Sequence, residues 1–342
     1  MRRKLIVNRA GPGLTVQDLG RPGYLAFGLS RGGAADRLAI AEGAALLGQS
    51  ESNAALEMAG IGGEFEATED MRIALTGAPM RASLDGTRLI WHASYHIPRG
   101  ARLSIGATES GTYGYLHIGG GLATNKHLGA RATHVAAGIG APVGNGVHLP
   151  IGDDIASSTT GLQIEVEPRF QGGQVRVVPS LQTDLFDPIE IARFQATVFR
   201  RDVRGNRMGV QLAFGDRGFH SEAGLRVISE IIVPGDIQIT GDGTPFVLLG
   251  ECQTTGGYPR IGSVIPSDLP RVVQARPGAV LRFCFVTLEE AVAVEKREQG
   301  RKRKLRSTLR PLVRDPSSIS DLLSYQLVSG ATVGDDSESN DL

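Results

Sequence analysis

The feature that most constrains the fold of this chain is an internal repeat. Three segments of the first half return in the second half, in the same order and roughly 173–187 residues later. The paired segments are residues 21–28 and 207–215, residues 63–77 and 236–250, and residues 98–105 and 276–283. A period this long indicates a duplicated domain, since solenoid repeats are about 20–45 residues long. Both copies consist of short β-type runs separated by glycine turns, so we expect two tandem β-rich domains.

Composition narrows the class of protein. The 342 residues include 46 glycines without a collagen period, which suits many tight turns. Lys+Arg and Asp+Glu are equal at 36 each, so net charge gives no attraction to nucleic acid or to an anionic membrane. No apolar stretch reaches the ~18 residues that span a bilayer, and the apolar run near the start is too short for a secretory signal. Cys252 and Cys284 form no disulfide framework. We therefore predict a cytoplasmic protein that binds neither nucleic acid nor membranes.

The chain divides into three parts on these patterns. We expect the first copy at residues 1–155 and the second at 174–298, joined by a polar, glycine-rich segment. Residues 299–342 are predicted to hold the end of a basic linker (296–310), a docking helix (317–328) and an acidic tail (335–342).

Three helices are marked by capping residues. Asp36 is the expected N-cap of a helix that ends at Leu47, before Gly48. Asp187-Pro188 predicts a short helix to about Gln195. Thr287 and Glu290 form a capping box, which opens a helix to about Glu298.

Candidate ligand-binding residues are concentrated after a short apolar strand, residues 245–250. Neutral polar groups, two adjacent glycines and an aromatic ring follow it: Gln253, Thr254, Thr255, Gly256, Gly257 and Tyr258. The glycines leave backbone N–H groups open to a ligand. The alternative is an ordinary Gly-Gly turn of a β-rich protein.

Further candidates lie at matching places in the two copies. They are Gln17, Asp18, Arg21 and Asp36 in the first copy and Arg207 in the second. An arginine binds a carboxylate as a fork, and backbone N–H groups stabilise an oxyanion, so the set suits carbonyl or amide chemistry on a small polar substrate. The alternative is that these residues pair with one another to hold turns.

The expected location is the groove between the two copies, because ligand sites favour domain interfaces. We expect Gln253, Thr254 and Tyr258 to line it, with Arg207 close by and Asp18 and Arg21 facing it. The sequence has no Walker A motif, no GxGxxG after a strand, no GxSxG elbow and no predicted metal-ligand set.

At this point the motifs resemble those of a known family. They are Val16-Gln-Asp-Leu-Gly-Arg-Pro-Gly-Tyr24, Gly33-Ala-Ala-Asp36, Asn206-Arg-Met-Gly209 and Gln253-Thr-Thr-Gly-Gly-Tyr-Pro259, with supporting matches over residues 5–295. The family is the allophanate hydrolase subunit 2 family, which also includes the C component of 5-oxoprolinase and is known as the biotin-dependent carboxyltransferase family.

The resemblance implies a mainly β fold of two tandem cyclophilin-like β-barrel domains with a few short helices. It implies an enzyme subunit that acts on a small amide with a subunit-1-type partner, which resembles the B component of 5-oxoprolinase. The leading expectation is ATP-dependent hydrolysis of 5-oxoproline to glutamate. One alternative is carboxyl transfer from carboxybiotin on a separate carrier, as in urea carboxylase. Another is a non-catalytic partner of a kinase-inhibitor-like protein.

Several positions depart from the family pattern. Glu42-Gly43 stands where the family often has Ala-Asn within the first helix, and Gly48-Gln49 stands where it has Gly-Asn after that helix. Ala130 and Ala132 stand where the family has serines, Glu251 stands where it has Asp, and Cys252 stands where it has Arg. These departures leave the substrate open.

Overall fold

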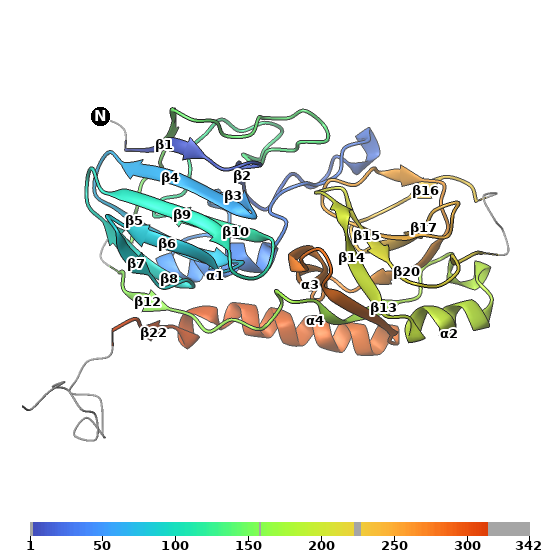
Figure 1. Ribbon diagram of the computed structural model, residues 1–342. Helices are drawn as coiled ribbons and strands as arrows, with labels where there is room; N and C mark the ends of the chain where they lie inside the picture. Colours follow the sequence, from blue (N-terminus) through green and yellow to red (C-terminus); the bar gives the residue numbers. More distant parts are fainter. Residues whose placement is uncertain (1–2, 157–158, 222–226, 314–342) are drawn as a thin grey trace, which may run out of the picture.

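The computed structural model describes residues 3–156, 159–221 and 227–313 (Figure 1). The described chain is mainly β with four α-helices, as predicted. The first half places its strands in two sheets, with orders β11-β1-β4-β9-β6-β7 and β2-β3-β10-β5-β8-β12-β22. The second half closes into a seven-stranded barrel, β13-β20-β17-β18-β15-β14-β21. The predicted docking helix (317–328) and acidic tail (335–342) lie outside the described residues.

The strands of the first half are β1 (Lys4–Ala10), β2 (Thr15–Gln17), β3 (Ala55–Ala59), β4 (Ile61–Ala67), β5 (Met71–Gly77), β6 (Met80–Leu84), β7 (Thr87–Leu89), β8 (Ala93–Ile97), β9 (Arg102–Thr108), β10 (Tyr113–Ile118) and β11 (Val147–Pro150). Side chains alternate along them: Leu5 and Val7 of β1, Phe65 of β4, and Leu103 and Ile105 of β9 are buried in one core. This core lies between the two sheets.

The strands of the second half are β13 (Gly173–Val178), β14 (Phe199–Gly205), β15 (Gly209–Ala213), β17 (Asp236–Ile239), β18 (Pro245–Leu248), β20 (Arg260–Val264) and β21 (Val280–Phe285), with the short pair β16 (Glu230–Ile231) and β19 (Thr255–Gly256) beside them. Phe194, Phe199, Phe219 and Phe283 pack in the barrel core with ring centroids 4.9–5.9 Å apart. Aromatic rings at these separations add to the stability that burial alone provides.

Helix α1 (Arg37–Leu47) begins where the sequence predicted. The Asp36 carboxylate accepts hydrogen bonds from the N–H groups of Leu38 and Ala39, and Gly48 ends the helix with φ 62°. The helix packs against β5 and β10 and is buried along most of its length. Gly43 is required there, because a Cβ would lie 2.3 Å from the His117 ring.

The remaining helices are α2 (Pro188–Ala196), α3 (Leu269–Gln274) and α4 (Leu288–Arg303), with 3-10 turns η1 (Leu25–Phe27), η2 (Thr183–Leu185) and η3 (Leu305–Thr308). The predicted N-cap at Asp187 and the capping box of Thr287 with Glu290 are both confirmed.

The N-terminal part of the predicted basic linker is helical in the structure, which corrects the prediction. Helix α4 runs five residues beyond the predicted end, to Arg303, so residues 296–303 are helical. Arg301 pairs with Glu167, and Lys302 pairs with Glu51 at 2.6 Å. Figure 1 shows α4 beneath both halves. Strand β22 (Arg310–Pro311) then pairs with β12 (Leu162–Gln163), which extends the sheet of the first half. Arg301 and Lys302 therefore bind a surface of the same chain, where the sequence predicted a solvated linker.

His117 makes stability depend on pH. Its ring is buried, with Nε2 2.8 Å from the Thr76 hydroxyl, and burial lowers its pKa from 6.5 to about 3. The unfolded chain takes up this proton below pH ~6.5 and the folded chain does not, so stability is full above that pH and declines as the pH falls toward 3. This one group is expected to remove about 2 kcal/mol between pH 8 and pH 5.

Urea unfolding of the wild type and of His117→Gln at both pH values checks this expectation. The variant loses this titration but keeps a polar side chain, so its stability should fall less between pH 8 and pH 5. An identical decrease in both proteins would contradict the assignment.

Candidate functional site

Arg207 lies at the contact between the two halves, where its guanidinium is fully engaged by protein groups. It donates to the carboxylates of Glu57 and Glu251 and to the carbonyl oxygen of Gly33. Both carboxylates are buried. Burial alone lowers the pKa of Arg207, but the charges of Glu57 and Glu251 outweigh this and raise it above the usual value. We call Arg207, Glu57 and Glu251 the central ion-pair cluster.

The other predicted residues of the first copy hold structure around this contact. Gln17 is fully buried and donates to Thr15 and to the Thr133 carbonyl. Asp18 accepts from the N–H groups of Gly20 and Arg131. Asp36, besides capping α1, accepts from Arg169 and from Gln274 of α3, at 2.8 Å each. These three side chains therefore hold the local structure, which is the alternative that the sequence left open.

Arg21 differs from them. It is 1% exposed and donates to the carbonyl groups of Ala132 and His127, while its Nη1 is buried and has no partner within the described chain. Its side chain lines a cavity between the halves.

The six residues from Gln253 to Tyr258 line a separate cavity, the loop cavity, of about 910 Å³. Asn206 and Met208, which precede β15, and Gln238 of β17 also line it, together with Gly28 of the first half. Arg207 does not line it. The structure therefore brings the loop residues together with one another, but it places them in a different cavity from Arg207.

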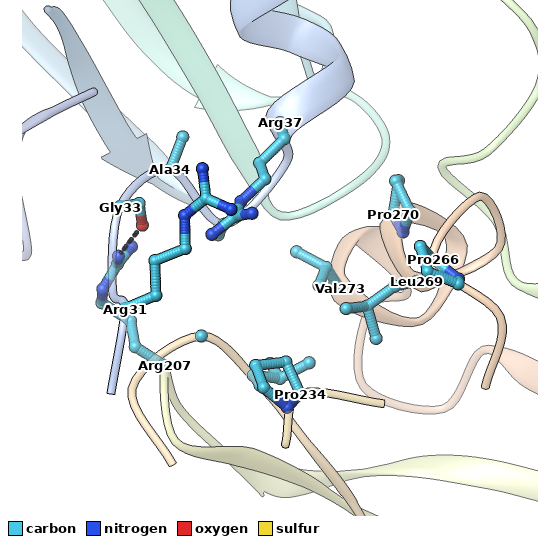
Figure 2. Close-up of a pocket in the computed structure, with 13 residues that line it drawn as sticks. Arg31, Gly33, Ala34, Arg37, Arg207, Pro234, Pro266, Leu269, Pro270 and Val273 are labelled. Atoms are coloured by element: carbon cyan, nitrogen blue, oxygen red, sulfur yellow. Dashed lines mark hydrogen bonds between the residues drawn. The ribbon is translucent and has the colours of Figure 1, made fainter. Parts of the chain in front are cut away.

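The cavity between the halves that Arg207 does line is shown in Figure 2. We call it the arginine cavity; its volume is about 320 Å³. Arg31 and Arg37 extend into it from one side, and the opposite wall is apolar. The apolar wall is formed by Pro234, Leu249, Pro266, Leu269, Pro270 and Val273 of the second half.

Arg31 and Arg37 have no carboxylate partner among the residues that the structure describes. Arg31 donates to the Leu19 carbonyl at 2.9 Å, and Arg37 donates to the Gly32 carbonyl at 3.3 Å. Burial and then the charge of Arg31 lower the pKa of Arg37 to about 10. Two neighbouring guanidinium groups against an apolar wall form a site for a small carboxylate with an apolar body.

Neither of these arginines was among the residues that the sequence indicated. Each flanks the segment Gly32-Gly33-Ala-Ala-Asp36, so the glycine pair before a helix was the available signal. What the sequence does not reveal is that neither cation is neutralised.

A phosphate site at the start of α1 does not fit the residues present. A helix N-terminus binds an anion through its free N–H groups. Here the Asp36 carboxylate already accepts two of them and adds a negative charge. Within the described residues there is no group of three or more His, Cys, Asp or Glu side chains placed to hold a metal ion. In the same described part of the chain, no helix is long and apolar enough to cross a lipid bilayer.

Comparison with known proteins decides the family. Residues 27–285 match the family described as carboxyltransferase domain, subdomain A and B. The chain belongs to this family. This confirms the resemblance drawn from the motifs. The family match also includes the segments that form the arginine cavity.

Two relatives are each named as the C component of 5-oxoprolinase. The Haemophilus influenzae protein is 30% identical over 83% of this chain and 92% of its own length. The Escherichia coli protein is 31% identical over 86% of this chain and 95% of its own length. Urea amidolyase of Saccharomyces cerevisiae is 25% identical over 82% of this chain, but the match covers 16% of that protein.

Solved structures share the fold. The protein TTHA0988 is 28% identical with a TM-score of 0.75, over 83% of this chain and 56% of that one, so this chain spans little more than half of it. Kluyveromyces lactis urea carboxylase has a TM-score of 0.77 at 20% identity, over 92% of this chain and 31% of that one. The relatives named 5-oxoprolinase and urea amidolyase belong to enzymes, so this chain is of an enzyme-subunit type.

Proposed function

We propose that this chain is one component of a heteromeric enzyme that hydrolyses 5-oxoproline to glutamate with ATP, together with a partner of the subunit-1 type. The relatives named as 5-oxoprolinase components support the proposal, because they align over nearly their whole length. The observation that carries it is the arginine cavity. 5-Oxoproline is a small lactam ring with one carboxylate, and the cavity offers two unneutralised guanidinium groups opposite an apolar wall.

In this proposal Arg31 and Arg37 hold the substrate carboxylate, and Pro234, Leu269 and Val273 pack against the ring. The carboxylate relieves the repulsion between the two cations, which favours binding. ATP activates the amide when it is bound. Because Asp36 occupies the start of α1, we assign the nucleotide site to the partner subunits and place no step of the ATP chemistry on this chain.

The direct test of the proposed function is ATP-dependent release of glutamate from 5-oxoproline by the chain purified with its partner subunits. Biotin-dependent incorporation of bicarbonate into urea is the parallel assay, and the similarity to urea amidolyase makes it the appropriate second one. Absence of glutamate release from the complete assembly would reject the proposal. Activity only in the second assay would favour the carboxyltransferase alternative.

Arg37→Met is expected to raise the KM for 5-oxoproline in this assembly by about ten- to a hundredfold. The reason is the loss of a charged hydrogen bond, which contributes about 1.5–3 kcal/mol. Stability should not fall, because Arg37 has no carboxylate partner among the described residues and lies beside the like charge of Arg31. Arg37→Lys keeps the charge but loses the forked pair of donors, so its KM should lie between those of the wild type and Arg37→Met.

Arg9→Met is the matched control, since Arg9 is an exposed arginine paired with Glu64 on the β1–β4 surface. Its KM should equal that of the wild type. An unchanged KM in Arg37→Met would remove Arg37 from the substrate site.

A further inference from the structure

Ser30, His134 and Glu251 lie in a row at the contact between the halves. The Ser30 hydroxyl is 3.0 Å from His134 Nε2, and His134 Nδ1 is 3.7 Å from the Glu251 carboxylate. All three side chains are buried. A nucleophile, a base and an orienting carboxylate in hydrolases are arranged in the same order.

The hydrogen bonds of His134 show that its ring donates to the Ser30 oxygen. The ring therefore cannot take a proton from Ser30, and Ser30 is not an activated nucleophile. The N–H of Ala137 donates to His134 Nδ1 at 3.2 Å, so Nδ1 carries no proton. Burial, opposed by the Glu251 charge, lowers the pKa of His134, which keeps the ring neutral. The ring proton is therefore on Nε2 and is donated to the Ser30 oxygen. Glu251 lies too far from Nδ1 for a hydrogen bond and instead accepts from Ala136 and Arg207.

This leaves the hydroxyl proton of Ser30 available. Its oxygen accepts from His134, and the described chain provides no other hydrogen-bond partner for the hydroxyl. Ser30 lines a cavity of about 240 Å³, which we call the serine cavity. The second half contributes the facing wall, with Ile232, Val233, Pro234 and Cys252. A hydroxyl held in this way has its proton free for a ligand in the cavity.

Arg21 supplies a second donor to the same cavity. Its Nη1 is buried without an acceptor among the described residues, which is unfavourable unless a ligand provides one. Arg21 also lies close to the ring that holds Ser30, because both approach Gly32. A Cβ on Gly32 would lie 2.9 Å from His134 Cδ2 and 3.6 Å from Arg21 Nη1. The Cys252 thiol adds no charge, since burial and then the Asp236 charge raise its pKa to about 12.

The serine cavity adjoins the arginine cavity. Arg31 and Pro234 line both. A ligand whose carboxylate is held at Arg31 therefore has the serine cavity beside it.

We propose that the serine cavity is an oxyanion subsite, in which the Ser30 hydroxyl and Arg21 Nη1 donate to the amide carbonyl oxygen of the substrate as negative charge develops on it. His134 acts as a positioning residue, because its Nε2–H fixes the direction of the Ser30 proton. No bond to Ser30 forms and its proton is not transferred. The identity of the substrate rests on the proposed function; the presence of a subsite for an oxygen anion does not.

The kinetic test uses the assembly of this chain with its partner subunits. Ser30→Ala is expected to lower kcat for glutamate release by about a hundredfold, the usual effect of removing one oxyanion donor, with KM changed by less than about threefold. His134→Gln keeps an N–H that can reach Ser30, so kcat should fall by less than about tenfold. Ser94→Ala is the matched control: Ser94 is a buried serine that bonds to Leu162, and its kcat should equal the wild-type value. A wild-type kcat in a folded Ser30→Ala assembly would overturn the proposal.

A binding test separates this proposal from the proposed function. Acetate is titrated into the isolated Arg37→Met chain at constant ionic strength, and the backbone amide signals of Ser30 and Ala137 are followed by NMR. Adding Ser30→Ala should weaken acetate binding by about three- to tenfold. If the wild-type assembly releases no glutamate, the proposed function fails and this titration alone decides the subsite. No acetate binding, or equal binding with and without Ser30→Ala, would overturn it.

Discussion

Replacing Arg207 with methionine is expected to lower the free energy of unfolding by about 3–5 kcal/mol, because it leaves two buried carboxylates without a counter-charge. Arg207 lies 150 residues from Glu57 and 44 from Glu251 in sequence, and its guanidinium also holds the Gly33 carbonyl. Glu57 has further donors, Tyr115 and the Ala35 N–H, but neither carries positive charge. The variant must therefore protonate a glutamate or open the contact between the halves.

Urea unfolding followed by circular dichroism measures this effect. Arg9→Met serves again as the control, and it should stay within about 0.5 kcal/mol of the wild type because its ion pair is exposed. The sequence indicated Arg207 as a ligand-binding residue, a role in which its loss reduces activity and leaves folding intact. The three protein partners of the guanidinium reverse that expectation. Wild-type stability in Arg207→Met, combined with lost activity, would restore a direct role in ligand binding.

Arg169→Met is the second large effect, with an expected loss of about 3–5 kcal/mol for the same physical reason. Arg169 is 4% exposed at its side chain and pairs with Asp36 at 2.8 Å and with Glu42 at 2.7 Å. It belongs to the segment between the two halves and binds both the N-cap and the body of α1. Burial raises the pKa of Glu42, and the charge and hydrogen bonds of Arg169 oppose that rise.

A double-mutant cycle with Glu42→Gln tests this arrangement. Glu42→Gln alone leaves Arg169 paired with Asp36, so it should lower the free energy of unfolding by less than Arg169→Met does. The double variant should be less destabilised than the sum of the two single variants, because each single change leaves an uncompensated group. Additive effects would show that the two side chains do not interact energetically.

Both clusters affect the candidate site through its walls. Arg207 holds the Gly33 carbonyl at the edge of the arginine cavity, and Asp36 fixes the start of α1 next to Arg37. Gln274 of α3 donates to Asp36 and to the Tyr113 carbonyl, which ties the apolar wall to the first half. The separation of the two halves, and so the width of the cavity, depends on these buried polar contacts.

Local signals in the sequence were sufficient for the helices and for the class of fold. Asp36, Asp187 and Thr287 cap their helices as expected, because a capping bond joins residues two or three positions apart. Alternating apolar residues and glycine turns indicated a mainly β chain, since a strand buries every second side chain. The motif strings identified the family. The end of α4 was missed because its last turns pair with Glu167 and Glu51, which are distant in sequence.

For the candidate site, too, some features could be predicted from the sequence and others depended on the tertiary structure. The sequence determined which residues could bind a small polar ligand, including Arg21 and the residues from Gln253 to Tyr258, because their chemistry is intrinsic. The tertiary structure decided which of those groups are already satisfied. Arg207 finds two buried carboxylates, while Arg21 Nη1 is buried without a partner among the described residues. Arg31, Arg37 and Ser30, which the sequence did not indicate, line cavities between the halves. An arginine has the same side chain in either case. Whether it stabilises the fold or awaits a ligand depends on partners that are distant in sequence, 44 to 174 residues away for Arg207. Its contacts with Glu57 and Gly33 exist only once the two halves have packed together.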